Sequence, residues 1–254
     1  MGKNLAIIFA RKHSTRLKEK HLILVNDMPL IQYTFEYAKR STAVDDVICS
    51  TDCKGIASLA RTCEIDVIKR PAELASDTSH IIDAVEHALL QYKKNKGILP
   101  EITTILYGNV PYRGTTIEKG LELFNNKNAD SVFTACKVLK YHPEWMFKNG
   151  GDGRIIFENK SSNYRCQDLP DYFIVTDSFI ISKTKTLLKR TTRTSLYSDF
   201  GENIYFVEEE SNTTVDIDDI HDLNYFRFLL SEKNKADIFG YWKESEEKPV
   251  HEKN

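Results

Sequence analysis

Several features that define other protein classes are missing from this chain of 254 residues. Its five cysteines are an odd number without a C-x-x-C pair, which argues against a disulfide framework or a zinc site and fits a reducing compartment. No run of about 18 apolar residues is present, and the N-terminal apolar stretch of about five residues is short for a signal peptide. We therefore expect a cytoplasmic protein without a membrane segment.

An excess of positive charge is also missing. The formal net charge is −2, which disfavours bulk binding of nucleic acid. Glycine is absent from the one strongly basic segment, Ile7 to His21, so this segment is neither a Walker loop nor G-x-G-x-x-G. With 41% hydrophobic and 28% charged residues, the chain is expected to form one soluble domain over residues 1–236, followed by a polar tail at 237–254.

The basic segment directly follows an apolar run. Leu5–Phe9 has the composition of a strand buried on both faces, and five cations follow it: Arg11, Lys12, Arg16, Lys18 and Lys20. In an open α/β sheet, ligands bind outside the carboxyl ends of the strands. Arg and Lys together suit a di- or triphosphate. The alternative is a solvated basic loop, because most charge runs are surface.

The rest of the first half alternates between strand and helix patterns. Expected strands are Leu5–Phe9, Val47–Ser50, Asp66–Ile68, Thr103–Tyr107 and Ser131–Ala135, and expected helices are Pro29–Arg40, Ile56–Thr62, Ile81–Tyr92 and Ile117–Phe124. Thr115 and Glu118 form a T-x-x-E capping box before the last helix. This alternation predicts an α/β fold, a doubly wound and mostly parallel sheet with helices on both faces.

The rhythm changes after Lys137. The glycine-rich turn at 149–153 and the strand pattern of Arg154–Glu158 predict a hairpin outside the sheet, within an excursion over residues 137–168 that could serve as an oligomer contact. Strand patterns resume at Tyr172–Ile181 and Ile204–Val207, and a last helix is expected from Asp219 to Glu232.

Val215-Asp216-Ile217-Asp218 is a second candidate for chemistry. In an extended segment, Asp216 and Asp218 point to one face, where two carboxylates could hold a hard cation such as Mg²⁺ together with a substrate phosphate. The alternative is that Asp218 or Asp219 only caps the following helix.

Two loops at the same expected edge of the sheet are further candidates. Arg70–Ser79 follows the third strand, and its rigid backbone could bind a nucleobase. Tyr107–Arg113 follows the fourth strand and carries Asn109 and Arg113. A purely structural role explains either loop equally well on spacing alone.

Six segments, in this order, resemble the acylneuraminate cytidylyltransferase family. The family pattern IPARGGSKRLPGKN is similar to IFARKHSTRLKEKH at residues 8–21, and GKPLIxYT and VSTD have counterparts at 28–34 and 49–52. RPxELAxDT is reproduced at Arg70–Thr78, QDLPxYY is similar to residues 167–173, and DIDTPEDL is similar to residues 216–223.

The resemblance implies a Rossmann-like nucleotidyltransferase that joins CTP to a 2-keto-3-deoxy sugar acid and releases pyrophosphate. It also implies Mg²⁺ as cofactor, a homodimer formed through the excursion, and no nucleic-acid or membrane partner. The implied nucleotide-binding residues are Arg11, Ser14, Arg16, Lys20, His21, Arg70, Leu74, Ala75 and Asp77. Sugar contacts are implied at Tyr107, Asn109, Arg113, Arg165 and Gln167, the metal at Asp216 and Asp218, and the catalytic roles at Arg11, Lys20 and Asp216.

The chain departs from the family pattern mainly on the sugar side. Tyr107 replaces a sugar-contacting Gln, and Thr176-Asp177-Ser178 replaces Asn-Gly-Ala, which predicts an acid other than plain N-acetylneuraminate. Lys12-His13 replaces Gly-Gly near the phosphates. Two alternatives therefore remain: a nucleotide-sugar-dependent glycosyltransferase, and a non-catalytic nucleotide-binding homologue.

Overall fold

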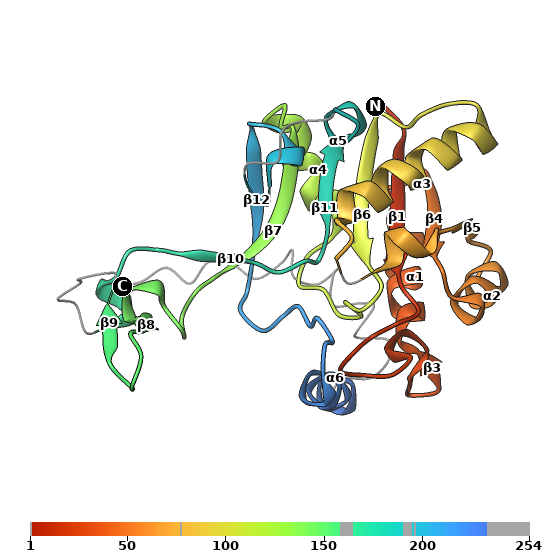
Figure 1. Cartoon of the computed structure of the whole chain (residues 1–254). Helices are drawn as coiled ribbons and strands as arrows, with labels where there is room; N and C mark the ends of the chain where they lie inside the picture. The colour runs from red at the N-terminus through yellow and green to blue at the C-terminus, as the bar shows by residue number, and fades with distance from the viewer. Residues whose placement is uncertain (1, 77, 158–164, 190–194, 196, 233–254) are drawn as a thin grey trace.

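The computed structural model describes residues 2–76, 78–157, 165–189, 195 and 197–232 (Figure 1). Its main element is an eight-stranded sheet with the path β10-β7-β11-β6-β1-β4-β5, in which β12 also pairs with β7. The strands are β1 (Asn4–Ala10), β4 (Asp46–Thr51), β5 (Asp66–Lys69), β6 (Ile102–Tyr107), β7 (Ser131–Lys137), β10 (Phe173–Val175), β11 (Ile180–Lys183) and β12 (Ile204–Glu209).

Helices cover both faces of this sheet. The helices are α1 (Leu30–Arg40), α2 (Lys54–Thr62), α3 (Ile81–Lys96), α4 (Ile117–Asn126), α5 (Thr184–Leu187) and α6 (Ile220–Glu232). Strand β1 is buried along its whole length, and its side chains alternate: Ala6 and Ile8 belong to the core packed under α1, α2 and α4, while Leu5 and Ile7 belong to the core under α3. The predicted doubly wound, mostly parallel architecture is confirmed.

Two local predictions are wrong. The run Tyr172–Ile181 forms two short strands instead of one: β10 and β11 both pair antiparallel with β7, along the edge of β7 that β12 leaves open, and residues 176–179 separate them. The N-cap of α4 is Thr116, not Thr115, and the Glu118 carboxylate accepts hydrogen bonds from Ser41 Oγ and the Thr42 N–H, both at 2.7 Å. Glu118 therefore fastens α4 to the loop after α1 instead of closing a capping box.

The predicted hairpin lies outside the sheet. Strands β8 (Phe147–Asn149) and β9 (Ile155–Phe157) pair only with each other, and Figure 1 shows them projecting away from the body of the molecule. The short helix η4 (Cys166–Asp168) follows. Residues 158–164 and the predicted tail at 237–254 fall outside the described residues.

Helix α6 closes the lower edge of the molecule in Figure 1. It buries Leu223, Phe226 and Leu230 against Tyr33 of α1 and against Val215 and Ile217, the residues that precede and separate the two aspartates. This packing holds the Asp216–Asp218 segment at the edge of the sheet. In the part of the chain that the structure describes, no helix has both the length and the apolar character needed to span a bilayer.

Candidate active site

A cavity of about 300 Å³ opens at the carboxyl ends of β1, β5 and β6. This is the edge at which ligands bind in open α/β sheets. The cavity brings together most of the predicted site: its lining includes Arg11, Lys20, His21, Arg70, Leu74, Ala75, Tyr107, Asn109 and Asp218. Side chains from both halves of the chain therefore share one recess.

The basic loop is fixed at both ends. The Lys12 N–H donates to Asp52 Oδ1 at 2.7 Å, which ties the loop to the end of β4. At the other end, Lys20 lies in the short helix η1 (Lys20–Leu22) and is buried, and its Nζ donates to the Ile217 carbonyl at 2.8 Å and to Asp218 Oδ1 at 2.9 Å. The loop is therefore docked onto the aspartate segment and is not a freely solvated run.

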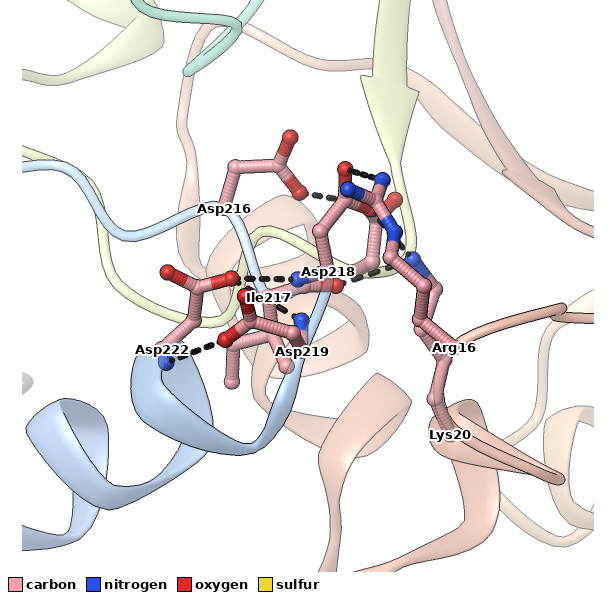
Figure 2. A network of polar contacts seen from close by, with 8 residues as sticks. Arg16, Lys20, Asp216, Ile217, Asp218, Asp219 and Asp222 are labelled. Atoms are coloured by element: carbon pink, nitrogen blue, oxygen red, sulfur yellow. Dashed lines mark hydrogen bonds and ion pairs between the residues drawn. The ribbon is translucent and has the colours of Figure 1, made fainter.

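Figure 2 shows how Arg16 and Lys20 converge on Asp218. Arg16 also forms an ion pair with Asp218, although the Arg16 side chain is 62% exposed. Ser14 is half-buried on the same loop but does not line the cavity. Two cations and one carboxylate thus meet beside a recess that could receive a charged phosphate chain.

His21 lies in the wall of the cavity with 4% of its surface exposed. Burial is the main reason that the pKa of His21 falls to about 3, and the charges of Lys20 and Arg70 lower it further. The imidazole is therefore neutral at physiological pH and acts as a packing and hydrogen-bonding group.

Arg70 is also buried at the base of the cavity. Its guanidinium donates to the carbonyls of Ser50, at 2.5 Å, and Ala10, at 3.3 Å, and lies over the Phe9 ring. Arg70 therefore fastens the ends of β1 and β4 and forms one wall, with Leu74 and Ala75 of helix η2 (Ala72–Ala75) beside it. Asp77, predicted for the same wall, lies outside the described residues.

The aspartate segment has the predicted alternation. Val215 and Ile217 are buried, and their N–H groups donate to the carbonyls of Tyr112, at 3.0 Å, and Asn109, at 2.8 Å. Asp216 and Asp218 therefore face the other way, toward the site (Figure 2).

Helix capping falls to neighbouring carboxylates. Asp219 Oδ1 accepts from the His221 N–H at 2.7 Å and the Asp222 N–H at 3.1 Å. Asp222 Oδ2 accepts from the N–H groups of Asp218 and Asp219, both at 2.9 Å. Asp219 and Asp222 therefore cap the start of α6. The carboxylates of Asp216 and Asp218 have no capping role and are available to the site.

The two carboxylates differ electrostatically. Desolvation of its carboxyl by the surrounding chain, and then the negative charge of Asp218, raise the pKa of Asp216 to about 6, although the residue keeps an exposed surface, and Asp216 accepts a hydrogen bond from Asn109 Nδ2. Partial burial opposes the ionisation of Asp218, but Lys20 and Arg16 outweigh it and lower the pKa of that carboxyl. Asp218 is therefore fully ionised at neutral pH, whereas Asp216 would gain most from a nearby cation.

This pair fits the predicted Mg²⁺. Among the described residues, no group of three or more His, Cys, Asp or Glu side chains is placed to hold a metal ion by itself. Mg²⁺ is commonly held by only one or two carboxylates together with substrate phosphates, and Asp216 supplies a carboxylate whose ionisation is otherwise disfavoured.

Arg113, which was predicted to contact the sugar, is instead a buried structural residue. Its side chain is completely buried and stacks on the Tyr37 ring, and it donates to the carbonyls of Ser178, at 2.7 Å, and Tyr107, at 3.0 Å. Burial lowers its pKa to about 10, so the guanidinium remains charged. Arg113 therefore holds the loop in place from inside and does not reach the cavity.

We expect Arg113→Leu to lower the free energy of unfolding by about 3 kcal/mol, because two buried carbonyls lose a charged donor. Urea denaturation measures this change. Arg61→Leu is the matched control, since Arg61 is exposed and its side chain donates to a carbonyl of its own helix. A loss below about 1 kcal/mol for Arg113→Leu would contradict this structural role.

Of the four remaining predicted sugar contacts, two line this cavity and two do not. Arg165 and Gln167 are exposed beside and within η4 and do not line the recess of their own chain. Tyr107 and Asn109, in contrast, line the recess. Glu209 is buried and accepts hydrogen bonds from three hydroxyl groups, but it is not among the predicted residues, because these partners are up to 33 residues away in the chain.

A family model and several known proteins match this chain over most of its length or over more than half of it. The model of the cytidylyltransferase family matches residues 5–150. The post-translational flagellin modification protein B of Campylobacter coli is 30% identical over 92% of this chain and 97% of its own length. The CMP-N,N'-diacetyllegionaminic acid synthase of Campylobacter jejuni is 27% identical over 92% of this chain and 97% of its own length.

Two further matches differ in length or in what they show. The N-acylneuraminate cytidylyltransferase of Escherichia coli is 26% identical over 94% of this chain, which spans only 55% of that protein. A solved structure of CMP:2-keto-3-deoxy-manno-octonic acid synthetase complexed with CTP aligns with a TM-score of 0.68 at 16% identity, over 91% of this chain and 99% of that chain. That structure shares the fold.

Proposed function

This chain belongs to the cytidylyltransferase family, and from that premise we propose that it activates a nonulosonic acid with CTP, giving the CMP-sugar and pyrophosphate. The observation that carries the proposal is the recess in which a nucleobase wall, the basic loop and Asp218 meet, with Asp216 hydrogen-bonded to Asn109 of the same lining. The anomeric hydroxyl of the acid attacks the α-phosphorus of CTP. The new bond is oxygen to phosphorus, the bond to pyrophosphate breaks, and the hydroxyl proton passes to water.

Each wall of the recess has a role in this reaction. Arg70, Leu74 and Ala75 bind the cytidine, while Arg11, Arg16 and Lys20 neutralise the triphosphate and the departing pyrophosphate. Asp216 and Asp218 would hold Mg²⁺, which when bound supplies charge neutralisation and a lower pKa for the attacking hydroxyl. Catalysis in this proposal is positioning together with charge stabilisation.

The two alternatives receive less support. A glycosyltransferase has no use for a basic loop that docks onto its aspartate pair, as Lys20 does here. The non-catalytic alternative was motivated by Lys12-His13 in place of Gly-Gly. Neither residue has a positive φ, and the Lys12 N–H still anchors the loop, so the loop holds its place without glycine.

The test is pyrophosphate release with Mg²⁺, each nucleoside triphosphate in turn, and a panel of acids. The panel contains N-acetylneuraminic, N,N'-diacetyllegionaminic, pseudaminic and 2-keto-3-deoxy-manno-octonic acids, whose names come from the related enzymes. We expect release with CTP and at least one nonulosonic acid. Release with UTP but not with CTP would refute the proposal. Failure of every acid in the panel to support release would refute it as well.

The hairpin β8–β9 supports a homodimer as part of this proposal. Phe147, Ile155, Ile156 and Phe157 are 45–56% exposed on a two-stranded sheet, which is a marginal structure by itself. A second copy of the chain would cover these side chains. It would also explain why Arg165 and Gln167, predicted to contact the sugar, lie on this arm: they would serve the partner's recess.

We expect Ile156→Asp to give a monomer, because a charge would be buried in the proposed interface. Sedimentation measures the mass, and the pyrophosphate assay measures turnover, which should fall because Arg165 and Gln167 no longer reach a second site. Leu90→Asp is a control, since Leu90 is similarly exposed on α3. A wild-type monomer, or an Ile156→Asp dimer with full turnover, would refute this arrangement.

A further inference from the structure

The turn between β10 and β11 brings an unassigned carboxylate to the edge of the recess. Ile180 of β11 pairs with Ile105 of β6 in antiparallel register. The ladder ends at this pair, and beyond it Arg113 bridges the carbonyls of Ser178 and Tyr107, so Asp177 is the neighbour of a residue held beside the Tyr107 that lines the cavity. The charge of Asp177 acts on both Tyr107 and Asp216, so this carboxylate lies near the Tyr107 side of the recess.

Arg113 confirms that the turn and the Tyr107 loop are neighbours. One guanidinium donates to the carbonyls of both Ser178 and Tyr107, at 2.7 and 3.0 Å. The Arg113 side chain is completely buried, so these two hydrogen bonds hold the two backbone segments at a fixed separation.

Glu209 fixes the other side of the turn. This buried carboxylate, at the end of β12, accepts hydrogen bonds from Ser178 Oγ at 2.7 Å, from Thr214 Oγ1 at 2.9 Å, and from Thr176 Oγ1. Thr214 comes two residues before Asp216, so one carboxylate joins the turn to the aspartate segment. The flanks of Asp177 are therefore held rigidly relative to Asp216.

Asp177 itself adopts an unfavourable backbone conformation. Its φ is 59°, in the left-handed region that favours glycine. Strain of this kind that is held by the surrounding structure is typical of functional sites.

The Asp177 carboxylate points to a ligand with hydrogen-bond donors. It is half-buried, and within the described part of the chain no donor is bonded to it. Its charge is close enough to Tyr107 and Asp216 to raise the pKa of both groups. Two neighbouring carboxylates would repel the carboxylate of a sugar acid and accept hydrogen bonds from its hydroxyl or amide N–H groups.

We propose that Asp177 is a specificity-determining residue, which accepts a hydrogen bond from a hydroxyl or amide N–H of the sugar acid and turns the substrate carboxylate away from the Asp177–Asp216 pair. This inference rests on the proposed function and names the residue that selects the acid. It also explains why the chain carries Asp where glycine would be the easier residue.

The experiment measures kcat and KM for each acid and for CTP in the wild type, Asp177→Gly and Asp177→Asn. For the preferred acid, we expect Asp177→Gly to raise KM at least about tenfold, the loss of one charged hydrogen bond, with the CTP KM within about twofold. Asp177→Asn should have a smaller effect, because its amide oxygen still accepts. Since glycine relieves the positive φ, the Tm of Asp177→Gly should not fall.

The control is Asp27→Gly, the same change at an exposed turn residue with φ 62°. Comparing 2-keto-3-deoxy-manno-octonic acid, which has hydroxyls but no amides, with N,N'-diacetyllegionaminic acid separates the two kinds of donor. Unchanged KM for every acid in Asp177→Gly, or an equal rise in the CTP KM, would overturn the inference while the proposed function stands. An inactive wild type would overturn the proposed function and this inference together.

Discussion

The Asp216→Asn variant is expected to lose at least about 10³-fold in kcat while remaining folded. The carboxylate of Asp216 lies close to that of Asp218 and is held by Asn109, which lines the recess, and its neutral analogue cannot balance the charge of a cation bound between the two aspartates. The amide can still pair with Asn109 through its oxygen, so the local structure should persist. Pyrophosphate release at saturating CTP and sugar acid measures the loss.

The difference in stability between the wild type and Asp216→Asn is expected to depend on pH. The pKa of Asp216 is raised from 3.8 to about 6 in the folded protein, so its ionisation opposes folding. Its contribution to stability is intact below the unfolded value and declines as the pH rises through the folded value. Asp216→Asn should therefore melt at the same temperature as the wild type near pH 4 and above it at neutral pH.

Thermal melts across this pH range test the prediction. Asp66→Asn is the control, because Asp66 lies at the start of β5, away from the recess, and pairs with Lys96 at the surface. Full turnover in Asp216→Asn would remove Asp216 from the catalytic group. A difference in Tm that does not change with pH would show that folding does not raise the pKa of the Asp216 carboxyl.

The order of strands and helices could be predicted because it depends on local patterns. Strand β1 is apolar at every position since both faces of the sheet are covered, and α3 repeats Ile82, Val85 and Leu89 on its buried side. The alternation of Asp216 and Asp218 with Val215 and Ile217 is equally local. Such features follow from a period that is visible in the sequence.

The errors have non-local causes. Arg113 follows a strand in a polar loop, a position that predicts an exposed side chain. Its guanidinium is instead buried, because it donates to the carbonyl of Ser178, which lies 65 residues away in the chain. The break between β10 and β11 falls on the polar residues Thr176–Ser178, but their arrangement depends on Glu209, about 30 residues further along the chain. These positions are decided by tertiary contacts, which override local pattern.

In the site, too, local features could be predicted and long-range contacts could not. The types of side chain could be predicted, but the docking of Lys20 on Ile217 and Asp218, across almost 200 residues, could not. That contact is what converts a basic loop into one wall of a recess. A substitution at Lys20 should therefore affect both ligand binding and the fold.

Lys20→Met is expected to lower kcat/KM for CTP by at least about 10³-fold and the free energy of unfolding by about 2 kcal/mol. Methionine has a similar length, but it leaves the buried Ile217 carbonyl without its donor and Asp218 without its main partner. The phosphates of CTP would then meet an uncompensated carboxylate. Steady-state kinetics and urea denaturation measure the two effects.

Arg16→Met is the matched comparison, because Arg16 pairs with the same carboxylate from an exposed position. An exposed ion pair contributes about 0–1 kcal/mol, so this variant should keep the stability of the wild type and lose only part of its affinity for CTP. Burial, not charge alone, accounts for the expected difference: the Lys20 side chain is 11% exposed and the Arg16 side chain 62%. Equal losses in the two variants would show that the loop acts as a diffuse positive surface, and the docked wall formed by Lys20 would have no special role.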